Sequence, residues 1–287
     1  MFKFNFGDNI DEKEETPSSK VTTHVWLKSE QIEPATENDA ILKDIISNCE
    51  ENTFQYKSQV LKYFSTVDIL NILRTSDECS LKNNLSVLDA DNDHSDLQTA
   101  IYEGGLKIWE CTYDLLQYIV NNNLNLKNKQ TLDLGCGSGL IGILSLVENA
   151  SFCTFQDYNA EILKYITIPN VILNNDAYLN KSNFYSGDWN SFVDLINHDN
   201  EEKKFDYIFT SETIYNIDCY EKLHEVFQKL LKKDGEIYLA AKSYYFGVGG
   251  GITSFKEFME QKKIFQYKTC WTSSDGLKRE ILKISFS

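Results

Sequence analysis

Hydrophobic positions follow different periods along the chain, and the pattern becomes regular after residue 100. From there, short runs rich in β-branched and aromatic residues recur between segments whose apolar residues follow the helical period. The clearest helical segments are AEILKYI (160–166), YEKLHEVFQKLLKK (220–233) and SFKEFMEQKK (254–263). The strand-like runs occupy residues 131–135, 152–157, 183–188, 205–211, 235–241, 265–271 and 279–287.

This alternation of strands and helices predicts an α/β fold of the Rossmann-like type. Strands separated by helices form parallel pairs, whereas the last two strands are joined only by the turn TSSDGLK (272–278). We therefore expect a seven-stranded, mostly parallel sheet with one antiparallel strand and helices on both faces. Such sheets bind ligands beyond the carboxyl ends of their strands.

The first third of the chain lacks this alternation and is predicted to be a partly helical N-terminal extension. Residues 7–23 are polar and acidic, so we expect them to be mobile. Residues 80–99 read as a connector, and the domain boundary is placed between residues 99 and 100. One or two helices are predicted from apolar residues at helical intervals, namely Ile41, Leu42, Ile45, Ile46, Val60, Leu61, Phe64, Ile69, Leu70 and Leu73.

Composition narrows the class of protein. The chain has 287 residues, 42% of them hydrophobic, but no apolar run of membrane-spanning length and no signal-peptide pattern, so an intracellular location is expected. Seven cysteines without a C-x-x-C pair favour reduced thiols, and we expect no metal site. The stretch DADNDHSD (89–96) resembles a calcium loop only superficially.

The net charge of −15 disfavours general nucleic-acid binding and would attract a basic protein partner. Residues 1–100 hold 9 basic and 19 acidic residues, a net of −10, so most of the excess lies in the first third.

Two glycine-rich stretches compete for the role of cofactor loop. LDLGCGSGLIG (132–142) follows the first predicted strand and opens a helix, and its glycines allow a tight turn close to a ligand. Asp157 lies 22 residues after Gly135, at the end of the next strand, where a carboxylate accepts both hydroxyls of a ribose. This combination predicts adenosyl nucleoside binding. YYFGVGGG (244–251) has no such acid and is predicted to overhang the crevice from the other side.

These residues resemble a known family. LDLGCGSGLIG is similar to the first motif of class I, seven-strand S-adenosylmethionine-dependent methyltransferases, over roughly residues 100–287. More narrowly, YEGGLKIWECTYDLLQYI, FQDYN, GDW, FTSETIYN, AAKSYYFGVGGG and the opening FKFNFG look like protein-histidine N-methyltransferases that modify a large-subunit ribosomal protein of the L-three type. The resemblance implies methyl transfer from S-adenosyl-L-methionine to the tele nitrogen of a histidine. It also implies a monomer in the cytoplasm and nucleus, without membrane binding.

The resemblance also implies a cofactor site. Within it, Asp157 would hold the ribose, Asp188 the adenine amino group and Trp189 an apolar wall, while Glu110 or nearby backbone would meet the methionine ammonium. Cys111 and Cys136 are interpreted as small packing residues. The implied cofactor residues are Ile108, Trp109, Glu110, Cys111, Thr112, Gly135, Gly137, Asp157, Tyr158, Asn159, Gly187, Asp188, Trp189 and Ser211.

The acceptor side is predicted around the end of the fourth strand and the second glycine loop. Glu212 is the candidate to fix the reactive histidine tautomer by accepting a ring N–H, with Tyr215 and Asn216 beside it. Substrate contacts are expected from Tyr244, Tyr245, Phe246, Gly247, Gly249 and Gly250, because bare backbone lets a protein loop approach closely.

Two alternatives remain open at this point. ETIY is similar to an acidic-x-x-Tyr pattern of protein-lysine methyltransferases, which would change the acceptor. The acidic first third also suits a ribosomal-protein chaperone that binds S-adenosylmethionine. The four histidines of the chain, His24, His94, His198 and His224, lie outside the predicted site.

Overall fold

The computed structural model describes residues 25–34, 39–76, 85–93, 95–197 and 203–287. Its centre is an eight-stranded sheet in the order β1-β6-β5-β4-β7-β8-β10-β9. The five central strands are parallel, and β10 runs antiparallel to β8 and β9. The strands are β1 (Glu30–Ile32), β4 (Gln130–Leu134), β5 (Phe152–Asp157), β6 (Ser182–Ser186), β7 (Phe205–Ser211), β8 (Leu231–Lys242), β9 (Phe265–Thr272) and β10 (Arg279–Phe286).

The seven predicted strands and the one antiparallel member among them are confirmed. The eighth strand, β1, comes from the N-terminal extension and pairs antiparallel with the edge strand β6. Its three residues are too few to show a strand pattern in the sequence. The strand forms through pairing with β6, which lies more than 150 residues further along the chain.

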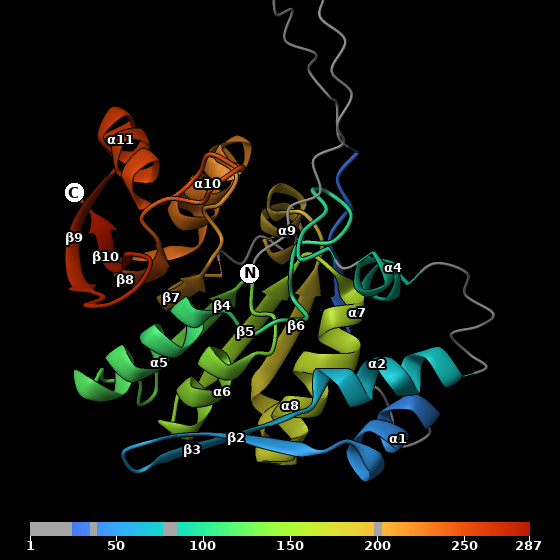
Figure 1. Ribbon diagram of the computed structural model, residues 1–287. Coiled ribbons are helices and arrows are strands. Elements are labelled where there is room, and N and C mark those ends of the chain that lie inside the picture. The colour runs from blue at the N-terminus through green and yellow to red at the C-terminus, as the bar shows by residue number, and fades with distance from the viewer. Residues whose placement is uncertain (1–24, 35–38, 77–84, 94, 198–202) are drawn as a thin grey trace, which may run out of the picture.

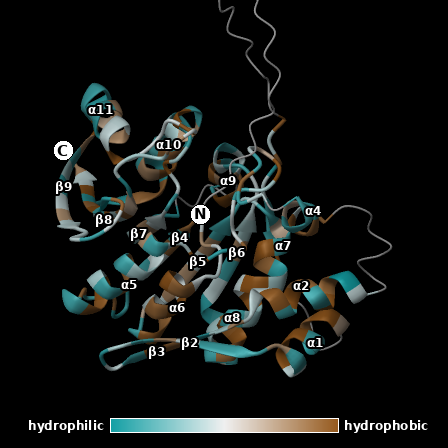
Figure 2. Cartoon of the chain, in the orientation of Figure 1, coloured by the Kyte–Doolittle hydropathy of each residue, from teal (hydrophilic) through white to brown (hydrophobic). Residues whose placement is uncertain are grey.

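Helices cover both faces of the sheet, as expected (Figure 1). One face packs against α5 (Glu110–Asn121), α6 (Leu140–Val147) and α8 (Ile168–Asn174), and the other against α9 (Trp189–Ile196), α10 (Tyr220–Leu230) and α11 (Ile252–Lys262). Seven of the eight residues of α6 are buried, and Figure 2 shows this helix as strongly hydrophobic. Shorter helical segments lie between these elements: α7 (Ala160–Ile162), a π-helix (Leu163–Thr167) and 3-10 helices (Asp176–Lys181 and Ile217–Cys219).

The described part of the extension forms a third apolar cluster beside the sheet layer. The described part of the extension contains α1 (Ala40–Asn48), the hairpin β2 (Glu51–Tyr56) and β3 (Gln59–Phe64), α2 (Thr66–Thr75) and α4 (Ser86–Asn92). Ile45, Phe64, Ile69 and Leu73 of these elements pack with Ile166 of the π-helix. The boundary at residue 99 stays a prediction, and the expected mobility of residues 7–23 concerns residues outside the described ranges.

Two predictions for the extension were wrong in detail. Val60, Leu61 and Phe64 lie in strand β3 rather than in a helix, because β3 pairs with β2 through a tight turn in which Lys57 adopts a φ of +52°. The connector predicted over residues 80–99 contains helix α4, whose Val87 and Ala90 are buried. Both segments are short, so their packing against the rest of the fold determined their secondary structure more than the spacing of their apolar residues did.

No helix among the described residues is long and apolar enough to cross a membrane.

Candidate active site

A cavity lies at the carboxyl ends of the parallel strands β6, β5, β4 and β7. It is lined by residues that directly follow or end each of these strands, including Gly187, Asp157, Gly135 and Ser211. Parallel strands that diverge at their carboxyl ends leave such a crevice in sheets of this topology. The sequence prediction of a ligand site at this edge therefore coincides with a cavity.

The first glycine loop shapes the floor of this cavity. Gly135, Gly137 and Gly139 have φ values of +67°, +49° and +76°, which lie in the left-handed region that favours glycine. A Cβ atom on Gly135 would lie 2.6 Å from the Thr213 side chain, so this position has no room for one. None of the glycines at 247, 249, 250 and 251 lines the cavity, so of the two glycine-rich loops only the first contributes to it.

Hydrogen bonds hold the Asp157 carboxylate against neighbouring backbone. One carboxylate oxygen accepts the backbone N–H of Gly137 at 2.8 Å and the other accepts that of Asn159 at 3.2 Å. Each oxygen keeps a lone pair for a further donor. Burial, with a smaller contribution from the negative charge of Glu103, raises the pKa of Asp157 to about 6. A buried carboxylate with free acceptor capacity fits a ribose diol, whose two hydroxyls donate to it.

Eleven of the fourteen predicted cofactor residues line the cavity. They are Ile108, Trp109, Thr112, Gly135, Gly137, Asp157, Tyr158, Gly187, Asp188, Trp189 and Ser211. They come from the start of α5 and the carboxyl ends of β4, β5, β6 and β7, which is why their spacing in the sequence is so wide.

Three predicted cofactor residues do not line the cavity. Cys111 is fully buried in the core under α5, and burial raises the pKa of its thiol well above the usual range. The Glu110 side chain, in the first turn of α5, is 63% exposed, and its carboxylate lies 3.9 Å from the Lys242 ammonium. Asn159 is buried and accepts the backbone N–H of Glu103 at 3.1 Å, so its side chain positions the Glu103 loop.

Glu103 occupies the place expected for Glu110. It lines the cavity, accepts the backbone N–H of Ala100 at 2.6 Å and also accepts the hydroxyl of Tyr215. The motif YEGG contains Glu103 and two glycines that permit a close turn. An acidic residue next to such a turn is the feature of the sequence that could have indicated Glu103. Glu103, rather than Glu110, is thus the carboxylate that lines the cavity, and the contact predicted for Glu110 stays a prediction.

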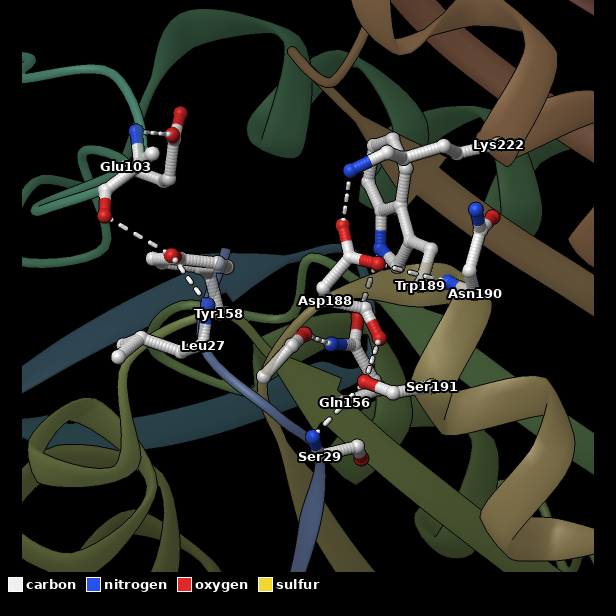
Figure 3. A network of polar contacts seen from close by, with 12 residues as sticks. Leu27, Ser29, Glu103, Gln156, Tyr158, Asp188, Trp189, Asn190, Ser191 and Lys222 are labelled. Atoms are coloured by element: carbon white, nitrogen blue, oxygen red, sulfur yellow. Dashed lines mark hydrogen bonds and ion pairs between the residues drawn. The ribbon is translucent and has the colours of Figure 1, made fainter. Parts of the chain in front are cut away.

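A polar network holds the end of the cavity beside β6 (Figure 3). Asp188 forms an ion pair with Lys222, which reaches in from α10, and accepts the backbone N–H of Asn190 at 3.1 Å. The indole N–H of Trp189 donates to the side-chain oxygen of Gln156 at 3.0 Å. This end therefore presents a carboxylate, an ammonium and an aromatic ring.

A second, more apolar groove opens next to the cavity. The two share Glu103, Trp109, Glu212 and Tyr215 as a common wall. The outer side of the groove is formed by Tyr244, Tyr245, Phe246, Val248 and Leu277. Tyr244 and Phe246 are 48% and 66% exposed, which is unusual for large aromatic side chains.

The glycines of the second loop shape the groove without lining it. Gly250 donates its backbone N–H to the carbonyl of Tyr215 at 2.9 Å, and Gly249 forms a β-bridge with Asn216. Gly247 has a φ of +83° in the turn between Phe246 and Val248. Gly247, Gly249 and Gly250 thus support the loop without lining the groove, and the Asn216 side chain caps the 3-10 helix by accepting the backbone N–H of Asp218. The substrate contacts predicted for these residues stay predictions.

Glu212 lies on the wall between cavity and groove and is only 7% exposed. One carboxylate oxygen accepts the Tyr245 hydroxyl. The other, Oε1, has no hydrogen-bond donor within the described part of the chain, although the Lys242 ammonium lies 3.7 Å away. The residue adopts a φ of +59°, so the chain turns sharply where β7 ends and aims this side chain at the wall.

Lys242 gives this wall a positive charge. It is 9% exposed and lies 5.1 Å and 5.7 Å from the ring centres of Trp109 and Tyr245. Burial and the charge of Glu212 raise the pKa of Tyr245 well above its usual range, and burial and Glu103 do the same for the pKa of Tyr215. Both hydroxyls therefore remain protonated donors at neutral pH.

Comparison with known proteins agrees with this arrangement. The profile of the family described as lysine methyltransferase matches residues 90–261, more than half of the chain. The chain is similar to the histidine protein methyltransferase 1 homologue of Bos taurus, with 43% identity over 216 residues covering 67% of this chain and 58% of that protein. It is also 29% identical over 308 residues to histidine protein methyltransferase 1 of Saccharomyces cerevisiae, covering 85% of this chain and 81% of that protein.

The chain thus spans about 58% of the length of the bovine relative. Among solved structures it resembles SMU.776 complexed with SAH, with a TM-score of 0.53 and 11% identity over 82% of this chain and 56% of that chain. At that identity the likeness concerns the fold alone.

Proposed function

The chain belongs to the lysine methyltransferase family whose profile it matches, and we propose that it methylates a histidine of a protein substrate with S-adenosyl-L-methionine as methyl donor. The observation that carries the proposal is the wall shared by the two sites. The cavity, whose lining fits a nucleoside, and the aromatic groove beside it meet at Glu103, Trp109, Glu212 and Tyr215. The similarity to histidine protein methyltransferase 1 supports histidine as the acceptor.

The residues of the cavity fit the parts of S-adenosylmethionine. Asp157 would accept the two ribose hydroxyls, and Asp188 would accept an N–H of the exocyclic amino group of adenine. Glu103 faces the ammonium of the methionine part. When bound, the cofactor supplies a methyl group on a positively charged sulfur.

Glu212 would orient the acceptor ring in the groove. A histidine side chain has an unperturbed pKa of about 6.5 and is mostly neutral at cell pH, so one ring nitrogen carries a lone pair and the other an N–H. Glu212 accepts that N–H, because its Oε1 is a buried carboxylate oxygen that lacks a donor. Trp109, Tyr215 and Tyr245 form flat walls on which an imidazole can pack.

The transfer itself needs positioning more than acid or base chemistry. With the cofactor bound, the ring nitrogen would form the new N–C bond while the S–C bond breaks, and the sulfonium would leave as a neutral thioether. Alignment at about 3 Å supplies most of the rate of such a displacement. The methylated ring is then an imidazolium, and Glu212 is placed to take its remaining N–H proton toward solvent.

We further propose the tele nitrogen as the target and a large-subunit ribosomal protein of the L-three type as the substrate. The sequence motifs that resemble that enzyme family support both. The net charge of −15 complements a basic ribosomal protein. A cytoplasmic and nuclear location, a monomeric state and the absence of general nucleic-acid binding belong to the same proposal.

Lysine is the second candidate acceptor. The family profile carries that description, and Glu212 and Tyr215 of ETIY both lie at the junction of cavity and groove. A lysine would have to lose its proton before attack, and the Lys242 ammonium close to Glu212 would assist this by repelling a second cation.

The acceptor can be identified by incubating the full chain with methyl-labelled S-adenosylmethionine and unmethylated ribosomal proteins, followed by amino-acid analysis. Label in methylhistidine of a large-subunit protein is the expected result. Label in methyllysine would replace the proposal by the second candidate. Cofactor binding without any label would favour a chaperone.

The glycine loop offers a test of the acceptor groove. A Cβ atom on Gly250 would lie 2.3 Å from the backbone oxygens of both Ile214 and Tyr215, so Gly250→Ala must push the loop away from Tyr215. We expect methyl transfer to fall about tenfold or more, since a misplacement near 1 Å is costly, with S-adenosylmethionine affinity changed less than about twofold. Single-turnover rates and calorimetric binding measure the two effects.

Gly249→Ala is the matched control, because a Cβ atom at this position would have no other atom within 4 Å and only the φ of +89° is strained. It should reduce transfer less than Gly250→Ala. A large loss of cofactor affinity in Gly250→Ala would show that the second glycine loop belongs to the cofactor site after all.

A further inference from the structure

The N-terminal segment that leads into β1 lies against the residues that follow β6, at one end of the cavity. The backbone N–H of Asp188 donates to the carbonyl of Leu27 at 2.9 Å, and the backbone N–H of Ser29 donates to the hydroxyl of Ser191 at 2.8 Å. The backbone N–H of Leu27 donates to the Tyr158 hydroxyl at 3.0 Å (Figure 3). A Cβ atom on Gly187 would lie 2.6 Å from the Cα atom of Ser29, so the segment lies directly on this glycine.

This attachment brings Trp26 to the cavity wall. Its ring meets the edge of Tyr158 at a centroid distance of 5.9 Å, and the Lys222 ammonium lies 3.6 Å from its ring centre. Lys222 also pairs with Asp188, which links the tryptophan to the carboxylate proposed for the adenine amino group.

The geometry decides which part of the cofactor meets Trp26. The transferable methyl must lie at the wall shared with the groove, where Trp109 and Glu212 stand. Asp157, at the end of β5, is the ribose acceptor, so the nucleobase extends beyond it in the sheet order β7-β4-β5-β6. Trp26, Asp188 and Lys222 surround that far end.

On this basis, which rests on the proposed function, we propose that Trp26 is a cofactor-binding residue that packs against the adenine ring. The Lys222 ammonium lies over the indole ring and pairs with Asp188, which holds the tryptophan at the end of the cavity where the base would lie. The family profile begins at residue 90, so this contribution comes from outside the matched part of the chain. The N-terminal segment is thereby part of the cofactor site.

Calorimetric titration of the full chain with S-adenosylhomocysteine tests the proposal. Trp26→Leu keeps an apolar side chain but removes the aromatic face, and it should raise the dissociation constant about tenfold, as expected for a lost aromatic-base contact. Trp26→Phe restores a ring and should stay within about threefold of the unmodified protein. Trp271→Leu is the matched control, because Trp271 is half-buried on β9 outside the cavity lining, and its affinity should not change.

The outcomes separate this proposal from the proposed function. If the unmodified protein does not bind S-adenosylhomocysteine, the proposed function fails. If it binds and Trp26→Leu binds equally well, the role of Trp26 is overturned while the function stands. If Trp26→Phe is as weak as Trp26→Leu, the effect is one of packing in the segment, and the contact with adenine is refuted. Thermal melting of each variant checks that it is folded. If Trp26→Leu does not fold, Trp26→Tyr and Trp26→Met provide the same comparison of an aromatic with a non-aromatic side chain.

Discussion

Replacing Glu212 with glutamine is expected to lower the rate of methyl transfer by about 100-fold or more, which is the size of effect that a positioned acid-base group supplies. Glutamine preserves the size of the side chain, but its amide no longer carries the negative charge that attracts the ring N–H of the acceptor. Because the proposed contacts of Glu212 are with the acceptor, affinity for S-adenosylmethionine should change less than about threefold. Single-turnover transfer rates and calorimetric binding measure these two quantities.

Two controls make the Glu212 result specific. Glu236→Gln removes a carboxylate that pairs with Lys283 away from both the cavity and the groove, and it should leave transfer unchanged. Tyr245→Phe removes the hydroxyl that donates to Glu212 and should produce a smaller loss in the same direction. Unchanged turnover in Glu212→Gln would remove this residue from the mechanism.

Replacing Asp157 with asparagine should raise the dissociation constant for S-adenosylmethionine by about 100-fold, because hydrogen bonds to a charged acceptor are worth about 1.5–3 kcal/mol each. The amide retains one oxygen for the N–H of Gly137 or Asn159, so the loop can keep its structure. Asp133→Asn is the matched control: this neighbouring aspartate is buried outside the cavity lining, and burial raises its pKa to about 8, so it is already neutral at pH 7. Retained affinity in Asp157→Asn would place the ribose elsewhere.

Acid should weaken cofactor binding through the same residue. The pKa of Asp157 is raised to about 6, and only its ionised form accepts two hydroxyls, so affinity should fall as the pH drops below about 6. The folded pKa exceeds that of the unfolded chain, so this group stabilises the ligand-free fold most at acid pH, and that contribution is lost as the pH rises through about 6. Calorimetry between pH 5 and 8 should show the acid dependence in the unmodified protein and its loss in Asp157→Asn.

Much of the cofactor side could be predicted from the sequence because its signals are local. The turn at Gly135, Gly137 and Gly139 needs left-handed backbone, which glycine supplies, and Asp157 ends a strand that its own composition predicts. The seven strands were located for the same reason, since each is a run of five or more residues with its own apolar pattern.

The sequence did not show which side chains near the IWECT motif face the cavity. Glu110 and Cys111 follow Trp109 directly, yet the helix that begins there turns one outward and the other into the core. Glu103, seven positions before Glu110, points into the cavity because Asn159 of a distant loop holds its backbone. Sequence adjacency predicts the neighbourhood of a site, whereas the helical rotation per residue decides which side chain faces it.

Short-range backbone preferences and periodicity suffice to predict the strands and helices after residue 100, the glycine turn and the acid that follows it. Only the tertiary structure decided that residues 59–64 form a strand, that Glu212 stands between cavity and groove, and that Trp26 reaches a site more than 100 residues further along the chain. Those outcomes arise from contacts between segments that carry no local sign of one another, and burial of apolar surface in the folded chain selects them.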